Sequence, residues 1–478
     1  MRMTNKKTII MAINIVFLIA QVVISLHILS GDILCEKWSQ PATIMSLVYA
    51  GIIILSFAVL KIKIYDFQFV FIILLYLFMY GRIWLNYLNM DDDLYWSLHV
   101  IFSKNVLLKA SLYVSCAVTA VFTGLITKYG VSKKDYRIDE QSINNNSKTS
   151  FLYSASLLLL LVGVPCRLFM DLKSVVEAQN AGGTYLGLSD YTGIIDDLAV
   201  LFIPGLLCLM ERKNRRERFA IAVIVIAYSV LVMILTGDRR YYVSGILAIG
   251  FYVAYKEREG FKRHKVLALF TVLLSLIFLN LLQIIREIRA GNLVSVTEFI
   301  GTYGYRMFDF STLVFDVLGE FGISFYSVCN IVENIPKALP YQYGLTFART
   351  IPSFLPVGFL FGDFFLYANP SSIINVSNGR YLGSTLIGDM YANFGFVFGI
   401  VFCFAFSALL SFIFKKCKRC NGGLHLIMYY SLFYFLINLT RCSVFESYRE
   451  TIWTCLIVYL IYYRYSKKTR VYYLRKCI

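Results

Sequence analysis

The chain alternates long apolar blocks with short polar stretches. Most blocks have about 20 residues, the length that a helix needs to cross a bilayer core of roughly 30 Å. They predict transmembrane helices near 8–30, 42–60, 66–88, 104–127, 151–170, 191–210, 219–237, 241–255, 266–284, 384–414, 424–441 and 447–463. The predicted fold class is therefore an all-α polytopic membrane protein with about 12 transmembrane helices.

This pattern divides the chain into four regions. Residues 1–284 carry the first nine predicted helices, 285–383 form one long loop rich in aromatic residues, 384–463 carry the last three helices, and 464–478 form a basic tail. A loop of this length is seldom structureless in a compact protein. We therefore expect 285–383 to be partly helical and to form a lid over the outward mouth of the helical bundle.

Basic residues gather in every second loop. Thirty of the 46 Lys and Arg residues lie in the segments 1–7, 61–63, 128–148, 211–218, 256–265, 415–423 and 464–478. Loops enriched in Lys and Arg stay in the cytoplasm. We therefore expect both termini to be cytoplasmic and the long loop to be periplasmic. This topology also explains the net charge of +17, so no nucleic-acid partner is predicted.

Composition excludes several classes of protein. The chain is 58% hydrophobic and 16% charged, whereas soluble domains are about 45–50% apolar and about 25% charged. An odd number of cysteines without regular spacing argues against a secreted disulfide scaffold. The four histidines are isolated, and no P-loop or GxSxG motif is present. No metal site and no cofactor are predicted.

Arginine is the preferred basic residue on the predicted outward side. A guanidinium group can bind phosphate through two parallel hydrogen bonds, which a lysine cannot do. An anionic, phosphate-bearing ligand is one explanation, and contacts with lipid headgroups or ion pairs with Asp and Glu are the alternative. The arginines concerned are Arg82, Arg167, Arg239, Arg240, Arg286, Arg289, Arg306, Arg349, Arg380, Arg441 and Arg449.

Two pairs of these arginines are the sharpest candidates for an anion site. Arg239 and Arg240 follow Asp238 at the predicted outward start of a helix, where the dipole and free N–H groups attract anions. Snorkelling at the membrane interface is the alternative. Arg286 and Arg289 share a helix face through their i, i+3 spacing, and neutralisation of one of them by Glu287 is the alternative.

Candidate carboxylates lie near the last three predicted helices and in the long loop. Asp389 and Asn393 are four residues apart at the outward start of the block 384–414, which would be about 46 Å long as one helix. Its first turns should therefore tilt or project outward. A carboxylate within a membrane helix is a candidate for function, and helix capping is the alternative. Glu320 and Glu446 are weaker candidates.

The motifs around these residues resemble those of the Wzy-type O-antigen polymerase family, the oligosaccharide repeat-unit polymerases of bacterial surface polysaccharides. The similar segments are 235–240 (LTGDRR), 319–325 (GEFGISF), Tyr343-Gly344 with the prolines that follow it, and 384–395 (STLIGDMYANFG). About twelve helices with a long periplasmic loop before the last three also resemble this family. The resemblance implies a GT-C-like, metal-independent glycosyltransferase of the bacterial inner membrane.

The resemblance also implies a substrate and partners. A glycan on undecaprenyl diphosphate would be transferred to a new lipid-linked repeat unit, with membrane lipids around the enzyme and a chain-length regulator and a flippase in the same pathway. Such a reaction needs a base and stabilisation of the diphosphate leaving group. The expected catalytic residues are Asp389 and Glu320. The expected diphosphate ligands are Arg239, Arg240, Arg286 and Arg289, and the expected sugar-binding aromatics are Tyr303, Tyr305 and Tyr343.

Two other functions remain open from the sequence. An O-antigen ligase, or a related lipid-linked glycosyltransferase, would share this architecture and chemistry. A polysaccharide flippase or transporter would carry charged residues within its helices and short loops on both faces, so the long outward loop argues against it.

Overall fold

The computed structural model describes most of the chain, and all of the elements in the described part are helices. The described ranges are 2–33, 35–90, 97–129, 146–180, 193–236, 240–257, 310–355, 364–380, 382–417 and 424–476.

Seven helices in these ranges are long and apolar enough to cross a membrane. They are α1 (Arg2–Ser30), α2 (Gln40–Leu60), α3 (Phe67–Tyr87), α5 (Lys104–Ile126), α6 (Asn146–Asn180), α9 (Arg215–Thr236) and α18 (Leu386–Cys417). An all-helical polytopic membrane protein is therefore confirmed.

The count of twelve stays a prediction. The predicted span 191–210 is divided into α7 (Ile194–Ala199) and α8 (Phe202–Arg212), and 266–284 lies outside the described residues. The other predicted spans correspond to α10 (Arg240–Lys256), to α19 (Leu424–Leu436) with η6 (Ile437–Thr440), and to α20 (Val444–Lys476).

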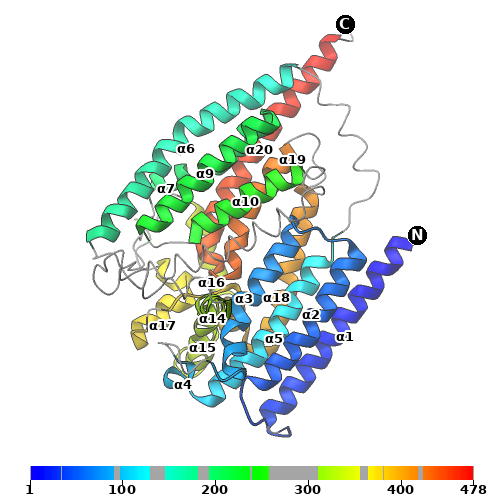
Figure 1. The fold of residues 1–478 in the computed structure, drawn as a ribbon, viewed down its shortest axis with the longest axis vertical. Coiled ribbons are helices and arrows are strands. Elements are labelled where there is room, and N and C mark those ends of the chain that lie inside the picture. The colour runs from blue at the N-terminus through cyan, green and yellow to red at the C-terminus, as the bar shows by residue number, and fades with distance from the viewer. Residues whose placement is uncertain are drawn as a thin grey trace.

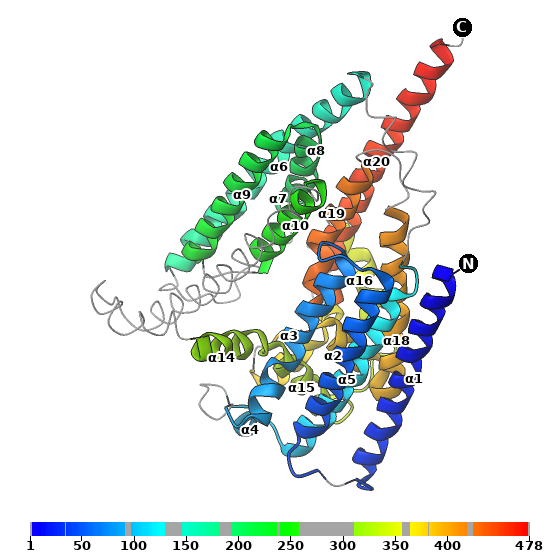
Figure 2. The same cartoon turned by 45° about the vertical axis from the view of Figure 1, so that its right-hand side comes forward.

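The helices form two groups. Helices α1, α2, α3, α5 and α18 pack side by side, with α5 at the centre of this group (Figure 1). Helices α6, α8, α9, α10, α19 and α20 form the second group, and the C-terminal part of α20 reaches one end of the molecule, whereas the start of α1 lies about midway along its long axis (Figures 1 and 2). In the most apolar stretch of α5, 89% of the residues are buried, because other helices surround it.

Helix α18 is not the single long helix that the sequence predicts, because it breaks at Gly395. This residue has φ 72° and ψ −163°, a conformation that only glycine adopts readily. The rings of Phe394 and Phe402 stack with centroids 3.7 Å apart, whereas eight residues of a continuous helix span about 12 Å. The chain therefore doubles back, and the first turns are buried instead of projecting outward.

The break leaves two pieces with different roles. Residues 386–394 form a short buried helix, which we call the half-helix. Residues 396–417 form a helix of roughly 33 Å at 1.5 Å per residue, which matches the thickness of a bilayer core.

The described part of the segment 285–383 contains short helices. These are α14 (Phe310–Phe321), α15 (Ser324–Asn334), α16 (Leu345–Thr350), η2 (Ile351–Phe354), η5 (Leu366–Ala368) and α17 (Pro370–Asn378). Helix α15 packs against α3, α5 and α18, and α16 and η2 pack against α20. The periplasmic location of this segment and its role as a lid stay predictions.

Close glycine contacts fix α14 against α3. A Cβ on Gly81 would lie 2.3 Å from the main-chain oxygen of Leu318, and one on Gly322 would lie 2.4 Å from the nitrogen of Arg82. The Arg82 Nε donates a hydrogen bond of 2.8 Å to the oxygen of Gly319. The motif Gly319-Glu-Phe-Gly322 therefore serves a close approach of two backbones.

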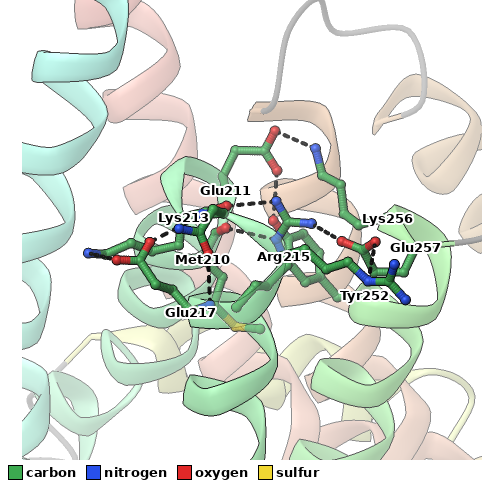
Figure 3. Close-up of polar contacts among 10 residues, drawn as sticks. Met210, Glu211, Lys213, Arg215, Glu217, Tyr252, Lys256 and Glu257 are labelled. Atoms are coloured by element: carbon green, nitrogen blue, oxygen red, sulfur yellow. Dashed lines mark hydrogen bonds and ion pairs between the residues drawn. The ribbon is translucent and has the colours of Figure 1, made fainter. Parts of the chain in front are cut away.

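A network of ion pairs joins α8, α9 and α10 at one end of their group (Figure 3). Glu211 accepts hydrogen bonds from Lys256 Nζ (2.6 Å) and Tyr252 Oη (2.7 Å). Arg218 Nη1 lies 2.6 Å from Glu257 Oε1. The segment 211–218 and the end of α10 at 256–257 therefore lie together.

Candidate functional site

Most of the predicted diphosphate and sugar ligands lie in parts of the chain without a described position. Arg239, Arg286, Arg289, Tyr303 and Tyr305 lie outside the described residues. Arg240 is the first residue of α10, and its backbone alone is described.

The start of α10, which carries Arg240, is fixed by contacts two residues later. Tyr242 Oη donates a hydrogen bond of 2.6 Å to Asp171 Oδ1 on α6, and the Arg167 guanidinium lies 4.9 Å from the Tyr242 ring centroid. Asp171 is buried and also accepts hydrogen bonds from Arg167 Nε (3.1 Å) and Tyr228 Oη. This cluster joins α6, α9 and α10.

Three of the predicted outward arginines form ion pairs. Arg167 pairs with Asp171 within α6, and Arg380 pairs with Glu333 of α15. Arg449 of α20 lies with Nη2 2.6 Å from Asp197 Oδ2 of α7. For these three arginines, the structure supports the ion-pair explanation of their position.

Asp389 is buried in the half-helix and fixes the start of another helix. Its side chain is 2% exposed. Ser384 Oγ donates a hydrogen bond of 2.5 Å to Oδ1, and the main-chain N–H of Val444 donates one of 2.7 Å to Oδ2. Val444 is the first residue of α20. The carboxyl group therefore caps the N-terminus of α20, where the helix dipole favours negative charge.

Asn393, one turn after Asp389, attaches the segment 342–344 to the half-helix. Its Nδ2 donates to Thr346 Oγ1 (2.7 Å) and its Oδ1 accepts from the N–H of Gly344 (3.0 Å). The main-chain oxygens of Ala392 and Asn393, which the break at Gly395 leaves without helical partners, accept from the N–H groups of Gln342 (3.0 Å) and Tyr343 (2.9 Å). The segment thus satisfies the end of the half-helix.

Tyrosines gather where this segment meets the half-helix. The Tyr341 ring centroid lies 6.3 Å from that of Tyr391 and 6.4 Å from that of Tyr343. Lys109 Nζ of α5 lies 5.7 Å from the Tyr391 ring centroid. Partial burial raises the pKa of Tyr341, the neighbouring Tyr391 hydroxyl adds to this, and the charge of Lys109 opposes it. Tyr343, a predicted sugar ligand, is 77% exposed.

Glu320 lies at the end of α14, beside the glycine contact with α3, and its side chain is partly exposed. Glu446, the weaker candidate, is partly exposed in the first turn of α20. Across the part of the chain that the structure describes, no three His, Cys, Asp or Glu residues form a group that could hold a metal ion.

The sequence reasoning overlooked several partners of these residues. Ser384 and the Val444 N–H complete the environment of Asp389, and Lys109 lies beside the tyrosines. The i, i+4 spacing of Arg167 and Asp171 is a signal for an ion pair that could have been used. The pairing of Arg449 with Asp197 has no such signal because 252 positions separate the two residues.

Comparison with known proteins relates the chain to a family. The family model described as O-antigen polysaccharide polymerase Wzy matches residues 9–469, a range that includes every candidate residue discussed above. No curated protein and no solved structure matches the chain.

Proposed function

Because the chain belongs to the O-antigen polysaccharide polymerase Wzy family, we propose that it joins undecaprenyl-diphosphate-linked repeat units at the periplasmic face of the bacterial inner membrane. The family implies a polymerising, glycosyltransferase-type activity on lipid-linked oligosaccharide repeat units. The observation that carries the proposal is the match over nearly the whole chain, together with seven helices that can cross a membrane.

The proposed reaction is a glycosyl transfer between two lipid-linked substrates. A hydroxyl of the new repeat unit attacks the anomeric carbon of the growing glycan, and a carbon–oxygen bond forms there. The bond between that carbon and the phosphate oxygen breaks, and undecaprenyl diphosphate leaves with the electron pair. The hydroxyl proton passes to a base, and cationic groups stabilise the charge of the leaving diphosphate.

Arg239, Arg240, Arg286 and Arg289 are the proposed diphosphate ligands. Two features support the first pair: Arg240 begins a helix, and Tyr242 anchors that end of the helix to α6. A helix start binds phosphate through its dipole and free N–H groups. We propose the transfer to be independent of metal, so EDTA should leave the yield of polymer from isolated membranes unchanged.

Asp389 and Glu320 are the proposed candidates for the base. The exposure of the two side chains favours Glu320, which is partly exposed. Both carboxyl oxygens of the buried Asp389 already accept hydrogen bonds, which suits a residue that positions α20. Tyr343, with Tyr303 and Tyr305, is proposed to contact the sugars.

Deleting the gene and separating the surface polysaccharide on a gel tests this function. A single repeat unit on the core indicates a polymerase, and complementation should restore the ladder. Unattached lipid-linked polymer would indicate a ligase, and complete loss of polysaccharide would indicate a flippase.

Variants of the arginines test the diphosphate site. Arg239→Ala and Arg240→Ala should shorten the polymer or reduce its yield at least tenfold at a normal protein level. Lysine should restore activity only in part, because it lacks the planar fork. Arg441→Ala is the matched control, because this arginine is exposed and outside the proposed site. A normal ladder from the double alanine variant would contradict the assignment.

Labelling in intact cells tests the proposed topology. Cysteines introduced at Arg216 and Tyr367, which are both exposed, should react from opposite sides of the membrane, with Tyr367 on the periplasmic side. Reaction from the same side would contradict the proposed orientation.

A further inference from the structure

The position of Lys109 is not explained by an ion pair within the described residues. It is five residues into α5, about 7.5 Å from the start of that helix, and its side chain is partly exposed. Its Nζ lies over the Tyr391 ring, 5.7 Å from the ring centroid. No acidic residue in the described ranges forms an ion pair with it. Lys104, on the same helix, instead donates to the main-chain oxygen of Glu36.

Three tyrosines extend from Lys109 to the surface. Tyr391 is buried, Tyr341 is partly exposed beside it, and Tyr343 is exposed at the outer end. The Oη of Tyr391 is buried and makes no hydrogen bond of ordinary geometry with the described residues, and the Tyr341 hydroxyl is its polar neighbour. Because a buried hydroxyl without a good hydrogen bond is unfavourable, this atom is a candidate partner for a ligand oxygen that enters beside Tyr341.

Tyr343 is held in a conformation that would be unfavourable without support. Its φ is 46°, a left-handed value that is uncommon for residues other than glycine, Asn and Asp. Such strain is often found where a residue serves binding. Its N–H and that of Gly344 are bonded to Asn393, so an exposed aromatic ring is presented on a fixed backbone.

The break in α18 makes this arrangement possible. A Cβ on Gly395 would lie 3.1 Å from the Tyr341 ring, so Tyr341 occupies the space that a larger residue would fill. The site therefore combines a rigid aromatic surface, one cation and a spare hydroxyl.

We propose that Lys109, Tyr341, Tyr343 and Tyr391 form a binding site for a sugar that carries a carboxylate, such as a uronic acid. Aromatic rings supply flat apolar surface for the sugar ring, and the ammonium of Lys109 binds the carboxylate. The absence of an arginine fork from these four residues favours a single carboxylate over a diphosphate. The inference rests on the proposed function, because the sugar would belong to the lipid-linked repeat unit.

Binding of simple glycosides to the full-length protein in nanodiscs tests the site. The probes are methyl β-glucuronide, methyl β-glucoside and inorganic pyrophosphate, measured by saturation-transfer NMR. The wild type should bind the glucuronide about two- to fivefold more tightly than the glucoside, the range expected for a partly exposed charge pair. Lys109→Met should remove this preference and keep glucoside binding, and Tyr343→Ala should weaken both.

Lys104→Met is the matched control and should keep the preference. Equal binding of the two glycosides by the wild type, or an unchanged preference in Lys109→Met, would overturn the inference. Competition by pyrophosphate at a lower concentration than the glucuronide would overturn it in favour of a phosphate site. An equal loss of the glucuronide preference in Lys104→Met and Lys109→Met would also overturn it, because the net charge of the surface would then explain the preference. These results do not depend on polymerisation, so the gene-deletion gel separates failure of this site from failure of the proposed function.

Discussion

Replacing Asp389 with asparagine and with alanine separates a structural role from a catalytic one. The Asp389 carboxyl accepts one hydrogen bond from Ser384 Oγ and one from the Val444 N–H. Asparagine keeps an oxygen for Val444, and its amide can donate to Ser384 once that hydroxyl rotates. Alanine removes both acceptors and leaves a buried hydroxyl and a buried N–H unpaired.

The expected magnitudes follow from these contacts. An unpaired buried polar group costs about 1–3 kcal/mol, so Asp389→Ala should lower the free energy of unfolding by about 2–6 kcal/mol. Asp389→Asn should cost about 1 kcal/mol because both partners stay bonded. Ser384→Ala removes one of the two hydrogen bonds and should lie between them.

Thermal unfolding of the detergent-solubilised variants and the polysaccharide ladder of complemented cells measure the two roles. For a structural role, Asp389→Asn should keep most of the polymer and Asp389→Ala should lose folded protein. A general base contributes about 10²–10⁴-fold to a rate. A stable Asp389→Asn variant without polymer would therefore show that Asp389 is the base, and an Asp389→Ala variant as stable as the wild type would refute the hydrogen-bond reasoning.

Two further predictions concern packing and charge. Arg449→Ala should lower the free energy of unfolding by about 3–5 kcal/mol because Asp197 is left buried and unpaired. The double variant Arg449→Ala with Asp197→Ala should lose less stability than the single variant. If thermal unfolding showed that the losses of the two single variants simply add, a direct pair would be contradicted. Gly81→Ala should prevent normal folding because its Cβ would lie 2.3 Å from a main-chain oxygen of α14. Gly51→Ala, in open space on α2, is the control, and equal effects on unfolding temperature would contradict this.

Hydrophobic pattern predicted where most helices lie but not where they break. Block length and composition are enough to predict a span because the bilayer requires apolar residues of a fixed length. The bend at Gly395 depends on a backbone conformation, and one glycine within an apolar block is also compatible with a continuous helix. The prediction that 384–414 is one long helix whose first turns tilt or project outward was wrong for this reason.

Residue spacing predicted contacts within a helix better than contacts between helices. Asp389 and Asn393 do lie on successive turns, and Asn393 Nδ2 donates to the main-chain oxygen of Asp389. One of the two partners of the Asp389 carboxyl is the main-chain N–H of Val444, 55 positions later. The sequence offered helix capping as the alternative role of Asp389, but a backbone donor has no signature in the sequence, so the capped helix, α20, could not be identified.

The half-helix connects two features that the sequence treats as separate. Asp389 fixes the start of α20, whose second turn carries Arg449, and Asn393 holds the segment that presents Tyr343. Because both residues belong to the same nine-residue piece, moving that piece would displace the ion pair of α20 and the tyrosines together. The break at Gly395 is what allows so short a helix to be buried while the rest of α18 stays long and apolar enough to cross a membrane. The contacts of Asp389 therefore assign it a structural role in positioning α20. A chemical role would require the Asp389→Asn variant to be folded and inactive.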